Sequence, residues 1–168
     1  ANNITLTSTS TIDEAADDTT ADITTAGTLA LTAVGGAIGA AGATGALDLV
    51  VGTLQATTNA GGIFLRESSG LIIGGNGVQT TGGNAAIEIT LAAGNLTLNE
   101  DITAAGSGDV TLVLSAADAQ LITDNANDGL TGSSTLPFIG MSGGVFGLED
   151  SQIGSMDEFA ESLLCGHA

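Results

Sequence analysis

Short alternations of apolar and polar residues recur along the middle of the chain. In most of them a glycine precedes two aliphatic residues that are separated by one other residue, as in Gly27-Thr-Leu29-Ala-Leu31. A period of two places the aliphatic side chains on one face of a β-strand and the residues between them on the other face. No apolar stripe with the 3.6-residue period of an amphipathic helix persists in this region. The pattern therefore predicts short β-strands.

The glycine motif repeats in one orientation along the chain. Steps between successive copies are 18, 16, 16, 17 and 14 residues, with a mean near 16. Such repetition is typical of a β-solenoid, in which each turn stacks on the preceding one. An antiparallel β-sandwich is the alternative, but it needs hairpin turns, and only one Asn-Gly dipeptide is present. We therefore expect an all-β fold, a single-stranded parallel β-solenoid with turns of 16 to 18 residues. The copies begin at Gly27, Gly45, Gly61, Gly77 (degenerate), Gly94 and Gly108.

Two stretches carry a resemblance to a known family. Residues 94–114 read GNLTLNEDITAAGSGDVTLVL, and residues 28–39 read TLALTAVGGAIG. Both resemble the repeats of filamentous-haemagglutinin-type proteins, and the resemblance extends over roughly residues 22–124. It implies a right-handed parallel β-helix that forms part of a large, secreted bacterial surface adhesin. It carries over no catalytic or binding residue.

The composition changes after about Gly129. Three of the four phenylalanines, the single proline and both methionines follow this point. We therefore divide the chain into a repeat region, 1–129, and a C-terminal segment, 130–168. Ser155-Met-Asp-Glu158 fits a capping box, which predicts a helix at about 155–165 that either caps the last turn or joins a neighbouring subunit. The apolar residues assigned to this role are Phe138, Phe146, Met156, Phe159, Leu163 and Leu164.

The charge balance excludes some classes of partner. The chain has 19 acidic residues, one arginine and no lysine, for a formal net charge of −18. A nucleic-acid binder needs cations that displace phosphate counterions, so we expect no nucleic-acid partner. The uncharged stretch 23–47 has few large aliphatic residues and no flanking basic residue, so we expect no membrane insertion. Cys165 is the only cysteine, which excludes an internal disulfide.

Two acidic clusters are either solvated surface or cation sites. Five carboxylates fall between Asp13 and Asp22, and hard oxygen ligands of this kind suit Ca²⁺. The second cluster, residues 124–129, resembles a calcium loop but has Ala126 at a ligand position and no glutamate at the twelfth position. Ca²⁺ is the cofactor that these residues could bind. The candidate ligands are Asp13, Glu14, Asp17, Asp18, Asp124 and Asp128.

The sequence contains no recognisable catalytic constellation. Arg66 and His167 lie far apart in the chain, and Asp48 and Asp109, both expected to face outward, fall in different motif copies. We predict a non-enzymatic structural or adhesive protein of the bacterial cell surface, outside the cell. It would be a solenoid segment or an end-to-end homo-oligomeric filament subunit, with a host or surface glycan or protein as a further partner. The alternatives are a carbohydrate-active β-helix enzyme and an ice-binding solenoid with an outward threonine array.

Overall fold

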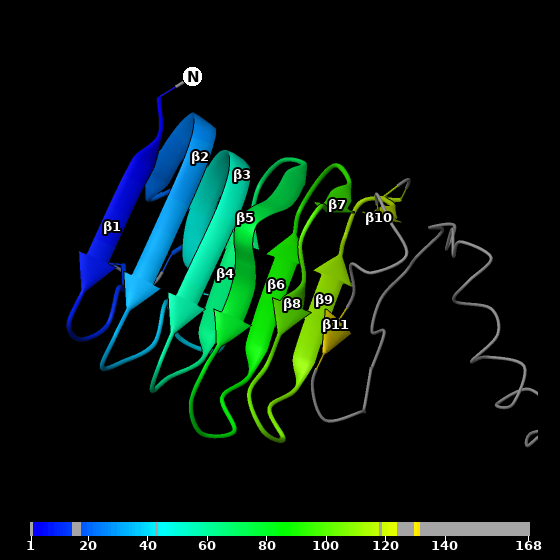
Figure 1. Cartoon of the computed structure of the whole chain (residues 1–168). Coiled ribbons are helices and arrows are strands. Elements are labelled where there is room, and N and C mark those ends of the chain that lie inside the picture. Colours follow the sequence, from blue (N-terminus) through cyan, green and yellow to red (C-terminus); the bar gives the residue numbers. More distant parts are fainter. Residues whose placement is uncertain (1, 15–17, 43, 118, 124–129, 132–168) are drawn as a thin grey trace, which may run out of the picture.

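The protein is a parallel β-solenoid. A computed structural model describes residues 2–14, 18–42, 44–117, 119–123 and 130–131. All strand pairings in this part of the chain are parallel, and Figure 1 shows the strands stacked side by side along one axis. The expected all-β parallel solenoid is confirmed. The strands are β1 (Ile4–Ser8), β2 (Ile23–Ala33), β3 (Leu47–Thr58), β4 (Ile63–Glu67), β5 (Leu71–Thr80), β6 (Ile87–Leu91), β7 (Leu96–Leu98), β8 (Ile102–Thr103), β9 (Val110–Leu114), β10 (Leu121–Thr123) and β11 (Leu130–Thr131).

One turn of the solenoid is longer than the sequence repeat suggested. Most stacked residues are 23 to 26 positions apart, as in the ladder of Ile12, Ile38, Ile63, Ile87 and Val110. The expected length of 16 to 18 residues is therefore wrong, although β3 and β4 are locally offset by 18. The reason is that one turn contains several short strands on different faces. Successive glycine motifs consequently do not occupy equivalent positions of successive turns. Even the motifs at Gly45 and Gly61, which share a face, stack two residues out of step, with Leu47 on Leu65.

The core consists of aliphatic ladders that run along the axis. Leu47, Leu65, Ile89 and Leu112 stack on one another from β3, β4, β6 and β9, and each is at most 6% exposed. Full burial of one such side chain contributes roughly 1.5–3 kcal/mol. Since the ladders are continuous from turn to turn, the turns share one core.

Side-chain amides also connect successive turns. The side-chain oxygen of Asn3 accepts a hydrogen bond from the Thr28 N–H at 3.0 Å. Asn95 accepts one from the Gln120 N–H at 3.0 Å. In both cases the donor lies 25 residues beyond the acceptor, so the amide satisfies a backbone group of the next turn at a corner.

Several predicted features lie outside the described residues. They include the helix at about 155–165 and all six residues assigned to capping or assembly. Leu130 and Thr131, the first two residues of the predicted C-terminal segment, form β11 and pair with β8. The uncharged stretch 23–47 begins with the strand β2, and none of the described residues forms a helix long and apolar enough to cross a bilayer.

Close packing between turns requires glycine at particular corners. Gly77 has a φ of 75°, and a Cβ at this position would overlap the backbone carbonyl oxygen of Asp101 in the next turn. Gly83 has a similar φ of 69°, but a Cβ there would meet nothing within 4 Å. The two positions therefore separate backbone strain from steric overlap.

We expect Gly77→Ala to destabilise the protein much more than Gly83→Ala. A left-handed conformation costs a residue with a Cβ about 1–2 kcal/mol, and both variants carry that cost. Only Gly77→Ala must also push adjacent turns apart. Chemical denaturation monitored by far-UV circular dichroism measures the two free energies of unfolding. Equal losses in the two variants would contradict the close packing of these turns.

Candidate functional site

A buried ion pair links β3 and β4. Asp48 and Arg66 are register partners, and the Arg66 Nη1 lies 2.9 Å from the Asp48 Oδ1. Asp48 is fully buried, whereas the Arg66 side chain is 26% exposed. Asp48 alternates with the core residues Leu47 and Leu49, as expected of an outward position, but it is buried instead of exposed. A buried carboxylate needs a charge partner, and Arg66 is the only arginine of the chain.

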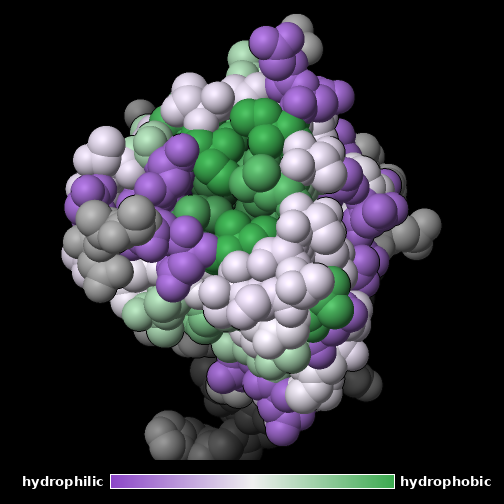
Figure 2. Space-filling model, turned by 90° about the vertical axis from the view of Figure 1, so that its left-hand side faces the viewer, coloured by the Kyte–Doolittle hydropathy of each residue, from purple (hydrophilic) through white to green (hydrophobic). Residues whose placement is uncertain are grey.

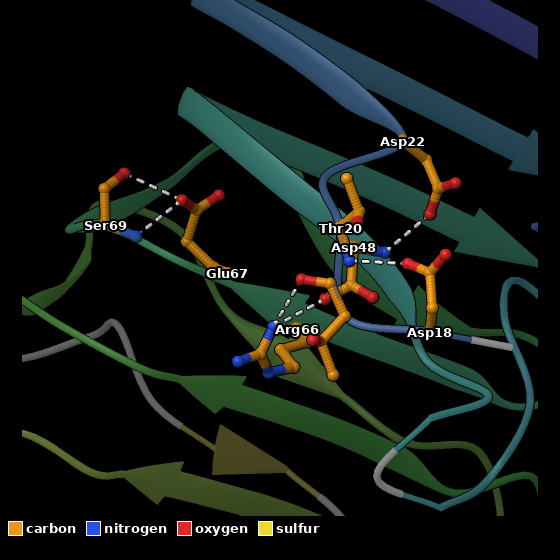
Figure 3. Close-up of polar contacts among 8 residues, drawn as sticks. Asp18, Thr20, Asp22, Asp48, Arg66, Glu67 and Ser69 are labelled. Atoms are coloured by element: carbon orange, nitrogen blue, oxygen red, sulfur yellow. Dashed lines mark hydrogen bonds and ion pairs between the residues drawn. The ribbon is translucent and has the colours of Figure 1, made fainter.

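The segment before β2 covers Asp48. Asp22, in this segment, is joined to the Asp48 backbone by two hydrogen bonds. The Asp48 N–H donates to the Asp22 Oδ2, and the Asp22 N–H donates to the Asp48 carbonyl oxygen. Arg66 also donates to the carbonyl oxygen of Thr19, at 3.2 Å. Figure 3 shows the Asp48 carboxylate between Arg66 and Asp18. Residues 18–22 thus close over a position that alternation alone would leave in solvent.

Three carboxylates meet at this place. One carboxylate oxygen from each of Glu14, Asp18 and Asp48 lies within 4.8 Å of the others. The structure therefore brings together two of the predicted ligands and adds Asp48. We name this group, Glu14, Asp18 and Asp48, the carboxylate cluster.

Of the other predicted ligands, Asp13 is the one that lies among the described residues, and it is not part of the carboxylate cluster. Asp13 instead accepts a hydrogen bond from the Glu14 N–H at 3.1 Å, which shapes the chain beside the cluster. Asp17, Asp124 and Asp128 lie outside the described residues.

Glu67 is a second buried acid, close to the ion pair in sequence but on the inward face. It stacks between Leu49 and Leu91 in a core ladder. Its Oε2 accepts from the Val51 N–H at 3.0 Å, and its Oε1 accepts from the N–H and hydroxyl of Ser69 at 2.9 and 2.7 Å. Burial raises the pKa of Glu67 above 4.5, although these hydrogen bonds act in the opposite direction. Nothing in the sequence pattern had singled out this residue.

Threonines occur in two columns of the outward face. One column consists of Thr28, Thr53, Ile72, Thr97 and Ile122, and the other has the longer run of threonines. Thr7, Thr32 and Thr57 stack in successive turns, and Gln79 and Thr103 continue the column. The neighbouring column contains Thr5, Ala30 and Gln55. An ice-binding array needs aligned pairs of threonines. Of these three turns, only the first has such a pair, Thr5 and Thr7.

Comparison of the chain with protein-family models, curated proteins and solved structures gives no match. The resemblance to filamentous-haemagglutinin-type proteins stays a prediction. The class defined by the structure is that of the parallel β-solenoids.

We expect Arg66→Met to lower the free energy of unfolding by about 3 kcal/mol. The substitution leaves the buried Asp48 carboxylate without its guanidinium, and breaking a buried pair typically costs roughly 3–5 kcal/mol; the lower end applies because Arg66 is partly exposed. Denaturation should be measured with a chelator present, so that no cation replaces the lost charge. The double variant Asp48→Asn/Arg66→Met removes both charges, and its free energy of unfolding should fall by less than that of Arg66→Met alone. A double variant as unstable as Arg66→Met would show that packing, and not charge, explains the loss.

We also expect Glu67 to make stability depend on pH. Because its pKa is higher in the folded state, Glu67 is protonated more often in the folded than in the unfolded chain at pH values between about 4.5 and the raised pKa. The contribution of Glu67 to stability should therefore fall as pH rises through the range between 4.5 and its raised pKa. Chemical denaturation of the wild type and of Glu67→Gln at several pH values across this range measures the difference between their free energies of unfolding. A difference that stays constant, or that moves in favour of the wild type as pH rises, would refute the raised pKa.

Proposed function

We propose that the chain is a non-enzymatic structural protein whose solenoid is extended end to end by a second copy of the same chain. The observation that carries this proposal is the uncovered core at the end formed by β1. We name this region the β1 end and define it by Ile4, Leu6, Ile12 and Ile23. Figure 2 shows apolar surface across the middle of this face.

Leu6 is the clearest sign that the described turns leave the core uncovered at the β1 end. It stacks on Leu31, which is only 1% exposed, yet Leu6 itself is 38% exposed. Both occupy inward positions of the same ladder, and the difference arises because no further turn covers Leu6 within the described part of the chain. Ile4, Ile12 and Ile23 are also only partly buried against the core. An additional turn would bury all four.

The free edge of β1 is suited to strand pairing. Among the described strands β1 pairs only with β2, so its other edge presents backbone N–H and C=O groups. Residues 4–8, with the sequence ITLTS, include no charged residue and no proline, which are the usual protections of an exposed edge. The internal pairings are parallel and place aliphatic residues on aliphatic residues, so another copy offers strands of matching alternation. Head-to-tail contacts of this kind produce an open fibre.

The proposal includes the predicted surroundings of the protein. The acidic surface, with a net charge of −18, would keep such fibres apart from one another. The resemblance to bacterial adhesins supports a location on the bacterial cell surface and a glycan or protein ligand. The C-terminal segment, 130–168 with a helix at about 155–165, is the proposed cap or second assembly element.

Two substitutions of equal chemistry test the role of the β1 end. Leu6→Lys places a charge on the open core, whereas Ile72→Lys changes an outward residue of β5 that is also 38% exposed. Both variants change the net charge equally. We expect the wild type and Ile72→Lys to form assemblies that lengthen with concentration, and Leu6→Lys to stay short. Analytical ultracentrifugation and negative-stain electron microscopy measure the lengths, after circular dichroism has verified folding.

Two results would overturn end-to-end extension through the β1 end. One is a wild-type protein that remains a monomer at every concentration. The other is a folded Leu6→Lys variant that assembles as the wild type does.

A further inference from the structure

We infer that the carboxylate cluster is a binding site for one Ca²⁺ ion. The inference is independent of the proposed end-to-end assembly, because the ion would be held within one chain. Three observations lead to it: the spacing of the oxygens, an unsatisfied buried oxygen and the local charge.

The spacing of the oxygens fits a single cation of this size. Calcium–oxygen distances are about 2.3–2.6 Å, so two oxygens on opposite sides of the ion are about 4.6–5.2 Å apart. The three oxygens of Glu14, Asp18 and Asp48 lie within 4.8 Å of one another, and one ion can therefore contact all of them. All three ligands are hard carboxylate oxygens, which favours Ca²⁺ over metals that prefer nitrogen or sulfur.

Asp48 supplies the independent evidence for a ligand. Its Oδ1 accepts from Arg66, but its Oδ2 is buried and has no hydrogen-bond partner among the described residues. A buried carboxylate oxygen in this condition calls for an explanation, such as a bound ion. Asp48 is fully buried, and one of its oxygens belongs to the cluster. A cation bound at the cluster would give this buried carboxylate a second partner beside Arg66.

The local charge matches a divalent ion. The three carboxylates carry three negative charges when ionised, and the Arg66 guanidinium balances one of them through Asp48. Two negative charges remain, equal in size to the charge of Ca²⁺. Asp18 is exposed and Glu14 is half-buried, so water can complete the six to eight oxygen ligands that Ca²⁺ takes.

The position of the site indicates what the ion would do. Glu14 and Asp18 belong to the connection between β1 and β2, whereas Asp48 belongs to β3. Ca²⁺ would therefore fasten this connection to the neighbouring turn, where residues 18–22 cover Asp48. A ligand that binds only the folded state also raises its stability.

The test is calorimetric titration of the full chain, stripped of metal by a chelator, with CaCl₂ at constant ionic strength. We expect saturable binding of one ion per chain and a higher unfolding temperature in Ca²⁺. Asp18→Asn and Glu14→Gln should weaken binding about tenfold or more, since each removes a ligand charge. Asp109→Asn removes an exposed carboxylate in the connection before β9, outside the cluster, and should leave the affinity unchanged. Asp18 is exposed, so its variant is expected to fold even if changes at Asp48 disturb the ion pair.

Three results would overturn the inference. The first is the absence of saturable binding and of thermal stabilisation beyond the effect of NaCl at equal ionic strength. The second is an equal loss of affinity in Asp109→Asn and Asp18→Asn, which would mean that Ca²⁺ only screens the acidic surface. The third is binding of Mg²⁺ with the same affinity, which would refute a calcium site.

Discussion

Parallel stacking of successive turns is the constraint on which the rest of this structure depends. Inward residues pack against their equivalents one turn away, as in the ladder of Ile63, Ile87 and Val110. Such a ladder forms part of the core and also fixes the register between turns. The same register brings Arg66 onto Asp48. The stacking also has no natural end, because a terminal turn always presents one uncovered layer. The core, the ion pair and the partial exposure of Leu6 in the described turns therefore share one cause.

The local part of this fold could be predicted from the sequence, and the long-range part could not. Alternation of apolar and polar residues depends on neighbours along the chain, and it correctly indicated strands at Leu29–Leu31 and Leu96–Leu98. The length of a turn depends on which faces those strands occupy. Leu29 stacks on Leu54, which belongs to no glycine motif, and Leu47 stacks on Leu65, which is two residues further along its own motif. Successive glycine motifs are therefore not stacked equivalents. The number of residues between motifs therefore reflects steps from one face to another as well as steps from one turn to the next, and it does not give the length of a turn.

The same distinction explains the candidate site. Glu14 and Asp18 could be identified because acidic residues are dense around them in the sequence. Asp48 could not, since alternation places it on the outward face and only the fold brings residues 18–22 over it. Glu67 presents the converse case: it lies in a core ladder between Leu49 and Leu91, where its acidic side chain contradicts the pattern. In both cases the register between turns determines the environment of the carboxylate.

The direction of the bonds between turns has a mechanical consequence. Hydrogen bonds that join one turn to the next run along the axis, so a force pulling the two ends apart acts on every interface between turns in series. The weakest interface would open first, while the others remain closed. Release of one turn of about 25 residues would lengthen the chain by roughly 80 Å, given an extended length of about 3.3–3.6 Å per residue. The molecule would then behave as a stepwise extensible tether that dissipates tension one turn at a time.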